Sequence, residues 1–121
     1  MIAFKYRFHG HGSLRFVYKN GQAVRTHLAT IKYSPNPHRK RPRFAVVVSK
    51  KVLKSAVGRN RIRRRVYEAL RPHLTPDFPS YDVVFIISSS EILNESPEAL
   101  QGFIGDLLHQ ATNHSATVKK Q

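Results

Sequence analysis

The sequence predicts one α/β domain, in which helices cover a β-sheet. Two stretches, 43–49 and 81–88, are rich in the apolar and β-branched residues that favour strands. Two others, 55–70 and 97–108, repeat apolar residues at the helical spacing of three and four. The chain has 121 residues, 40% of them hydrophobic, which suits a single domain with one modest core.

The first third of the chain is expected to hold a short helix and one strand. Ser13 is a candidate N-cap for a helix over 14–20, and Gly21 is placed to end it. The apolar residues of this segment fit a helix and a strand about equally well, and we choose the helix. The β-branched residues of 24–33 predict a strand, and the prolines of 34–42 predict a loop.

The middle of the chain is expected to form a strand and a basic helix. The almost continuous apolar run in 43–49 suggests a strand buried on both faces. The helix over 55–70 ends before Pro72. One side of this helix carries an apolar stripe of Ile62, Val66, Ala69 and Leu70. On the other side we expect Asn60, Arg61, Arg64 and Arg65, with Arg59 and Arg63 at the edges.

The last third is expected to form a strand over 81–88 and a long amphipathic helix. Ser96 is the candidate N-cap of that helix, and Pro97 occupies the first helical position. We expect one domain over 1–121, with flexible ends at 1–12 and 113–121.

Charge is distributed very unevenly along the chain. The formal net charge is +14 at pH 7, yet residues 1–67 hold 18 basic residues and no acid. The first of the seven acidic residues is Glu68, so all of them lie in residues 68–121. This asymmetry points to a polyanion bound by the first half, against the alternative of a merely soluble charged surface. Nucleic acid is favoured over a membrane surface, since Trp is absent and the basic residues are not confined to one amphipathic helix.

Composition also limits the compartment and the chemistry. There is no cysteine, which excludes disulfides and thiolate metal sites. No apolar run approaches the ~20 residues that span a bilayer, and the N-terminus lacks a signal-type apolar stretch. We expect a cytoplasmic protein without membrane association.

The densest basic feature joins the end of the second strand to the start of the basic helix. Arginines packed this closely repel one another unless phosphates neutralise them, and their planar fork of donors matches a phosphate. The alternative is a solvated basic face. The loop over 39–43 is a second basic cluster, either a phosphate contact or a solubilising loop. The RNA-binding candidates are Lys50, Lys51, Arg59, Asn60, Arg61, Arg63, Arg64 and Arg65.

Aromatic residues in the basic half suggest contacts to unpaired bases, which stack on aromatic rings in many RNA-binding proteins. Phe16 is better explained as a core residue. Tyr18 and Tyr33 fit stacking and core positions about equally. A nuclease with two metal ions needs neighbouring carboxylates, and residues 1–67 contain none. His9 and His11 are weak evidence for a metal or acid–base pair, so we expect no catalytic side chain and no protein-held metal.

The segments 43–51 and 55–64 resemble the protein component of bacterial ribonuclease P. They read Arg-Phe-Ala-Val-Val-Val-Ser-Lys-Lys and Ser-Ala-Val-Gly-Arg-Asn-Arg-Ile-Arg-Arg. The family carries an Arg-x-Gly-x-x-Val-Ser-Lys-Lys strand and an Ala-Val-x-Arg-Asn-Arg-x-Lys-Arg helix. Segments 17–21 and 81–84 also resemble the family, so the resemblance covers about 14–110.

The resemblance implies an α+β sandwich with a mixed sheet of about four strands, three of which the sequence predicts directly. It also implies a left-handed β-α-β crossover into the basic helix, as in a domain of a small-subunit ribosomal protein. The implied assembly is a ribonucleoprotein in which an RNA subunit, holding Mg²⁺, removes the 5′ leader from precursor tRNA. The protein would be monomeric apart from its RNA complex.

The resemblance also assigns contacts. It places the basic candidates on ribonuclease P RNA and Tyr18 on the leader of precursor tRNA, and we add Tyr33 to the leader contacts. Ala45 replaces the usual Gly, Leu14 stands where an aromatic is frequent, and Tyr67 where a further Arg is frequent. The connection 52–55 is one residue longer than usual. The alternatives are a general structured-RNA-binding module, such as a ribosomal protein, and a protein-only nuclease, which the missing carboxylates disfavour.

Overall fold

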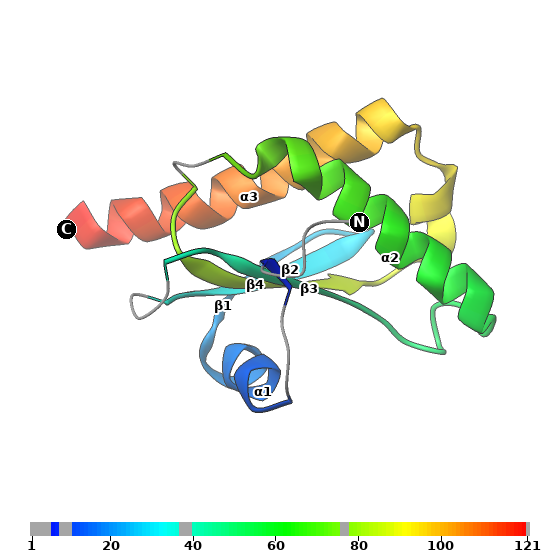
Figure 1. Cartoon of the computed structure of the whole chain (residues 1–121), viewed down its shortest axis with the longest axis horizontal. Helices are drawn as coiled ribbons and strands as arrows, with labels where there is room; N and C mark the ends of the chain where they lie inside the picture. The colour runs from blue at the N-terminus through cyan, green and yellow to red at the C-terminus, as the bar shows by residue number, and fades with distance from the viewer. Residues whose placement is uncertain (1–5, 8–10, 37–39, 76–77, 121) are drawn as a thin grey trace.

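Three α-helices and four strands make up the computed structural model, which describes residues 6–7, 11–36, 40–75 and 78–120 (Figure 1). Side chains of 11–13 and of 113–120 are outside the description. The elements are α1 (His11–Asn20), β1 (Gln22–Arg25), β2 (Ala29–Pro35), β3 (Arg43–Val48), α2 (Ala56–Leu70), β4 (Tyr81–Ile87) and α3 (Pro97–Lys120). Two short 3-10 helices, η2 (Arg71–His73) and η3 (Ser90–Asn94), follow α2 and β4.

The sheet is mixed, and its strand order is β1-β2-β4-β3. β1 pairs with β2 and β2 with β4 in antiparallel fashion, whereas β3 and β4 are parallel. The parallel pair is joined through α2, because parallel neighbours need a crossover connection. The four-stranded mixed sheet expected from the resemblance is therefore confirmed, and the left hand of the crossover stays a prediction.

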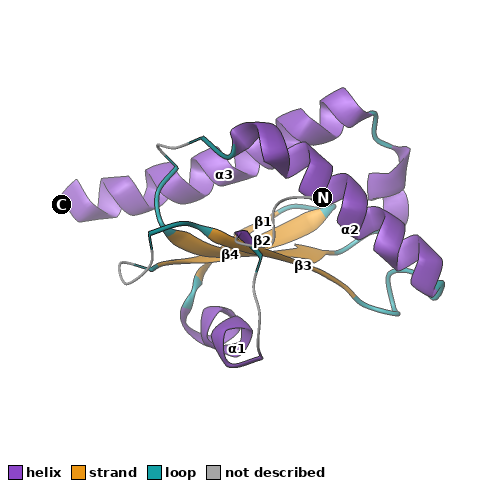
Figure 2. Cartoon of the chain, in the orientation of Figure 1, coloured by secondary structure: helices purple, strands orange, loops and turns teal. Residues whose placement is uncertain are grey.

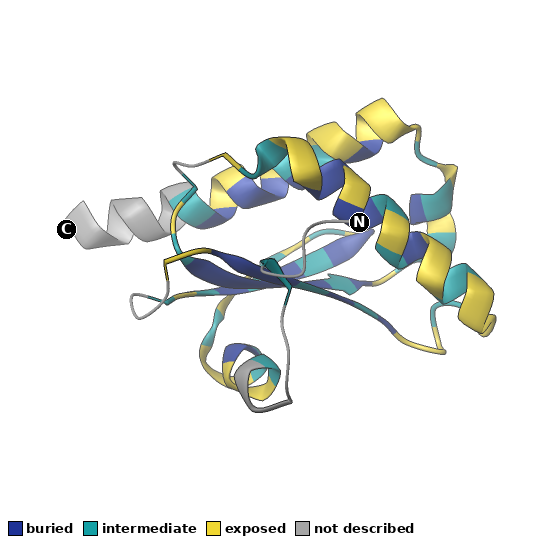
Figure 3. Ribbon diagram, in the orientation of Figure 1, coloured by how far each residue is buried: buried dark blue, intermediate teal, exposed yellow. Residues whose placement is uncertain are grey.

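The two faces of the sheet are covered differently. Helices α2 and α3 lie on one face, and α1 lies on the other (Figure 2). Residues of β2, β3 and β4 alternate between these faces, as pleated strands require. The main core lies under α2 and α3, where Figure 3 shows the inner sides of the helices as buried. Its largest fully buried side chains include Tyr33, Phe44, Phe85, Ile62, Leu70 and Leu100.

The prediction of one strand over 24–33 is wrong, because the segment folds into the hairpin of β1 and β2. The amide of Thr26 donates to the Ala29 carbonyl (3.0 Å), and the Thr26 hydroxyl accepts from the Ala29 amide (3.1 Å). The turn contains neither Gly nor Pro, which are the usual sequence signals for a hairpin. The predicted loop also begins too early, since β2 continues through Ser34 to Pro35, its last residue.

Helix ends follow local capping chemistry. The Ser55 hydroxyl accepts from the Gly58 amide (3.1 Å), and the Ser96 hydroxyl accepts from the Ala99 amide (3.1 Å), so α2 and α3 begin where predicted. Helix α1 is confirmed, but it starts at His11, so Ser13 lies inside it rather than at its cap. Gly21 directly follows the last residue of α1, and a side chain does not fit there, because a Cβ would lie 2.6 Å from the Val17 carbonyl oxygen.

The strands over 43–49 and 81–88 are confirmed to within one residue. Burial on both faces was expected of β3, but it is an edge strand whose Ala45 and Val47 are only half-buried. The central strand β4 is the one buried on both faces, with Tyr81 to Phe85 all inside. In the part of the chain that the structure describes, no helix is long and apolar enough to cross a bilayer. The flexibility expected of 1–12 and 113–121 stays a prediction.

Candidate nucleic-acid interface

The outer side of α2 is an exposed basic surface, as the helical periodicity predicted. Asn60, Arg61 and Arg64 are exposed, and Arg63 is half-buried. Lys50 and Lys51 are exposed in the turn that leads from β3 to this helix. We call these six residues the α2 basic face. In the described part of the chain, no carboxylate forms an ion pair with Arg61, Arg63 or Arg64. Their charge therefore remains available to an external anion.

Arg59 holds the connection that precedes α2. Its guanidinium donates to the carbonyl oxygens of Leu53 (3.1 Å) and Lys54 (2.7 Å). The Leu53 side chain in turn lies so close to Gly58 that a Cβ there would be 2.5 Å from Leu53 Cδ2. Arg59 therefore shapes the first turn of the helix, and its predicted RNA contact stays a prediction.

Arg65 occupies a different environment from its neighbour Arg64. Its guanidinium donates to the carbonyl oxygens of Ile92 (3.3 Å), Leu93 (2.7 Å) and Glu95. The sequence placed Arg65 on the outward side, but it is half-buried and tethers the segment between β4 and α3. Arg65 is therefore a structural arginine in the free protein, which corrects our grouping of it with the outward arginines.

Tyr18 lies on α1, which covers the second face of the sheet. It is half-buried, and burial raises the pKa of its hydroxyl. Lys32 of β2 donates to the Tyr18 carbonyl oxygen (2.7 Å), and its ammonium lies 5.5 Å from the centre of the Tyr18 ring. An aromatic ring and a cation thus meet beside the sheet face that α2 and α3 do not cover. The leader contact of Tyr18 stays a prediction.

Tyr33 is a core residue, which corrects its place among the leader contacts. Only 1% of its surface is exposed. Its hydroxyl donates to Gln22 Oε1 (3.2 Å), and its ring lies 6.3 Å from that of Tyr81. No face of the ring is open to a base. The prediction for Phe16 is wrong in the opposite sense. We expected Phe16 in the core, but 57% of its surface is exposed.

A buried ion pair on the second sheet face was missed by the sequence analysis. Arg43 Nε donates to Asp82 Oδ1 (2.9 Å), and its NH2 group donates to Oδ2 (2.8 Å). Asn36 Nδ2 also donates to Oδ2 (2.9 Å). Arg43 had been assigned to the basic loop over 39–43, of which residue 39 lies outside the described residues. The sequence signal for this ion pair was Asp82, a single acidic residue inside the apolar strand predicted over 81–88.

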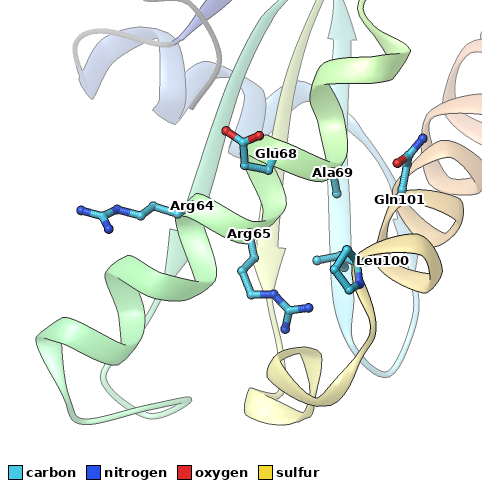
Figure 4. A pocket seen from close by; sticks show the side chains of 7 residues that line it. Arg64, Arg65, Glu68, Ala69, Leu100 and Gln101 are labelled. Atoms are coloured by element: carbon cyan, nitrogen blue, oxygen red, sulfur yellow. The ribbon is translucent and has the colours of Figure 1, made fainter.

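A pocket of about 380 Å³ lies between the basic helix and the start of α3 (Figure 4). Ala69 and Leu100 are apolar and buried, whereas Glu68 and Gln101 are exposed at the margin. Arg64, Arg65 and Pro97 complete the lining. Sequence reasoning did not predict this pocket, because it depends on how α2 and α3 pack together.

Metal ligands do not gather in the described residues, where no group of three His, Asp or Glu side chains could hold an ion. His9 lies outside those residues, and the side chain of His11 is also undescribed. The predicted pair of His9 and His11 is therefore not tested.

Comparison with known proteins gives a consistent family. A family model described as Ribonuclease P matches residues 3–112. A protein of Carboxydothermus hydrogenoformans named "Ribonuclease P protein component" is 41% identical over 73 residues, which cover 60% of this chain and 62% of that protein. A protein of the same name from Chlamydia trachomatis serovar L2 is 36% identical over 95 residues, covering 70% and 78%.

Solved structures share the fold. The RNase P protein of Staphylococcus aureus superposes with a TM-score of 0.75 at 24% identity, covering 88% of this chain and 94% of that one. The RNase P protein of Thermotoga maritima gives a TM-score of 0.70 at 21% identity, covering 80% and 89%.

Proposed function

This chain belongs to the ribonuclease P protein family, and we propose that it acts as the protein subunit of a ribonuclease P. In this proposal it binds the ribonuclease P RNA and the 5′ leader of precursor tRNA. The assembled ribonucleoprotein then removes the leader by an Mg²⁺-dependent endonucleolytic cut. The protein binds and positions RNA, and the RNA subunit carries the catalysis.

The α2 basic face is the observation that carries this proposal. Arg61 and Arg64 are exposed on a helix whose first turn adds free backbone N–H groups and a partial positive charge. Lys50 and Lys51 extend the same positive surface toward β3. Cations without acidic partners repel one another in the free protein, so a phosphate backbone that neutralises them binds favourably.

Tyr18 and Lys32 support a separate contact for the single-stranded leader. Unpaired bases stack on aromatic rings, and an ammonium group neutralises the neighbouring phosphate. The two side chains lie within 5.5 Å of each other, which is close enough to serve one nucleotide. Tyr18 belongs to α1 and Lys32 is bonded to it, and Figure 1 shows α1 on the opposite face of the sheet from α2. The leader and the RNA subunit are thus proposed to occupy different sides of the protein.

Mg²⁺ is proposed to be held mainly by the RNA of the holoenzyme. The described protein side chains do not form a cluster suited to the ion. In this scheme Mg²⁺ supplies the Lewis acid that phosphodiester hydrolysis needs. The contribution of the protein is electrostatic, because arginines that neutralise phosphates lower the repulsion between the RNA subunit and its RNA substrate.

Reconstitution tests the proposal. The full chain is mixed with a bacterial ribonuclease P RNA and a precursor tRNA at a low Mg²⁺ concentration. We expect the protein to stimulate cleavage at the 5′ end of the mature tRNA. Cleavage by the protein without the RNA would contradict the proposed division of labour. Tight binding to unrelated structured RNAs without stimulated cleavage would favour the general RNA-binding module instead.

A matched pair of variants assigns the stimulation to the α2 basic face. Arg61→Ala removes an exposed arginine of that face, and Arg25→Ala removes an exposed arginine of β1. We expect Arg61→Ala to weaken binding to the ribonuclease P RNA and to reduce the slope of log K against log salt by about 1. Arg25→Ala should leave the slope unchanged, and equal effects of both variants would argue against a localised interface.

A further inference from the structure

The pocket between α2 and α3 has an apolar floor and a polar margin. Ala69 and Leu100 form the floor, being 6% and 1% exposed. In Figure 4 the side chains of Glu68 on α2 and Gln101 on α3 lie on opposite sides of Ala69, and the guanidinium of Arg65 lies on the side of Leu100. The volume of the pocket, about 380 Å³, is at the lower end of the roughly 300–1,000 Å³ typical of small-ligand pockets.

The polar margin suits a neutral planar group better than a phosphate. The Arg65 guanidinium is already bonded to three backbone carbonyls. The Glu68 carboxylate accepts from Arg71, and its charge would repel a phosphate in the pocket. The Gln101 amide is exposed and offers both a donor and an acceptor. A nucleobase presents the matching set, with flat apolar faces and N–H and C=O groups at its edge.

The pocket is continuous with the α2 basic face, because Arg64 belongs to both. Figure 4 shows the Arg64 guanidinium pointing away from the pocket floor, while its stem lines the edge. A phosphate held by Arg64 would therefore lie outside the pocket. The base of the same or the next nucleotide could then turn inward onto Ala69 and Leu100.

We propose that this pocket binds one unstacked nucleobase of the RNA that contacts the α2 basic face. The base lies on the apolar floor, the Gln101 amide hydrogen-bonds its edge, and Arg64 holds the adjoining phosphate. This inference rests on the proposed function and adds to it a contact with a base. It gives the protein a means of selecting RNA that has an unpaired nucleotide at the required place.

Two short single-stranded RNAs test the inference with the full chain. One is an oligoadenylate, and the other has the same length and charge but carries abasic ribose throughout. Gln101→Ala removes the amide from the pocket. Gln110→Ala is the matched control, because Gln110 is also exposed on α3 and nine residues place it on the opposite side of the helix. Binding is measured by fluorescence anisotropy, and circular dichroism checks that the variants fold.

We expect Gln101→Ala to weaken oligoadenylate binding about three- to tenfold, as the loss of one or two hydrogen bonds would. Binding of the abasic RNA should not change, and Gln110→Ala should bind both RNAs like the unchanged protein. In NMR spectra, the side-chain amide resonances of Gln101 should shift with oligoadenylate and not with the abasic RNA.

Three outcomes would overturn the inference. One is that Gln101→Ala and Gln110→Ala behave alike with both RNAs. Another is that Gln101→Ala weakens both RNAs equally, which would make the contact independent of the base. If Arg61→Ala still weakens binding in these cases, the proposed function stands and only the pocket assignment fails. If neither RNA binds the unchanged protein, the pocket assignment fails, and the proposed function is judged separately by the reconstitution with ribonuclease P RNA and precursor tRNA.

Discussion

The two faces of the sheet are built on different principles. The face under α2 and α3 is closed by large apolar side chains, among them Phe44, Phe85 and Ile62, each 0% exposed. The face under α1 is covered by a single short helix and carries Lys32 and the Arg43–Asp82 pair. Folding stability is therefore concentrated on the first face. The second face keeps polar groups at positions where a core would place apolar ones.

In the proposed function, this difference separates the residues that stabilise the fold from those that bind RNA. The helix that closes the core also presents the α2 basic face on its far side, so its inner residues can be optimised for packing and its outer residues for phosphates. On the α1 side, the proposed leader contacts, Tyr18 and Lys32, also take part in packing α1 on the sheet. Substitutions on the two faces should consequently differ in which property they change, the free energy of unfolding or RNA affinity, and in the size of that change.

The largest effect is expected from neighbouring residues of β4 that face opposite ways. Phe85→Ala removes a fully buried ring from the core side and should lower the free energy of unfolding by about 3–5 kcal/mol. Ile86→Ala removes a half-buried side chain from the α1 side, and we expect less than half of that loss. Urea unfolding of both variants measures the difference. Equal losses would mean that the second face is as much a core as the first.

The next largest effect is expected from the buried ion pair. Arg43 is only 8% exposed, so Asp82→Ala would leave a buried guanidinium without its carboxylate, which should cost about 3 kcal/mol of stability. The double variant Arg43→Met with Asp82→Leu replaces the pair by apolar groups and should recover much of that loss. Chemical denaturation compares the free energies of unfolding of the single variant, the double variant and the unchanged protein. If the single variant is as stable as the unchanged protein, the pair does not support the second face.

Adjacent arginines of α2 sharpen the comparison within one helix. Arg65→Ala removes the donors to three backbone carbonyls and should lower the free energy of unfolding by about 2 kcal/mol. Arg64→Ala should change stability by less than about 0.5 kcal/mol, since Arg64 is exposed. RNA affinity should respond in the opposite order, with Arg64→Ala reducing the salt slope by about 1. A reversed pattern would exchange the roles assigned to the two residues.

The smallest effect is expected at the two tyrosines first grouped as leader contacts. Tyr18→Ala should weaken binding of precursor tRNA by roughly 1 kcal/mol, the lower end of what a stacked base contributes, and leave binding of leaderless tRNA unchanged. Tyr33→Phe removes one hydrogen bond inside the protein and should leave both affinities unchanged. Filter binding with the two RNAs measures this. An effect of Tyr33→Phe on the precursor alone would contradict the burial of Tyr33.

Local patterns predicted the elements whose signals lie within a few residues. The cap at Ser96 and the apolar stripe of α2 required only the sequence around them. The hairpin at Thr26 was missed because a threonine hydroxyl takes the place of the usual Gly. Its prediction as one strand shows that β-branched residues signal strands but do not show where strands end.

Features that depend on distant residues could not be predicted in the same way. Helical periodicity placed Arg65 on the outward side, but the residue is half-buried because its partners come from residues 92–95, some 30 positions later. Arg43 and Asp82 meet only because β3 and β4 are paired in register. The sequence therefore identified the α2 basic face as a set of residues, and the structure separated its exposed members from those that hold the fold together.

The place of β4 has a consequence for synthesis on the ribosome. It is hydrogen-bonded to both β2 and β3, yet it is the last strand to emerge. Until residue 87 has left the exit tunnel, β3 lacks its partner, and the apolar sides of β2 and α2 have no complete sheet to join. A nascent chain that ends before residue 80 would present a cationic helix with an uncovered apolar side. The sheet is therefore completed late, when most of the length of the domain has already been translated.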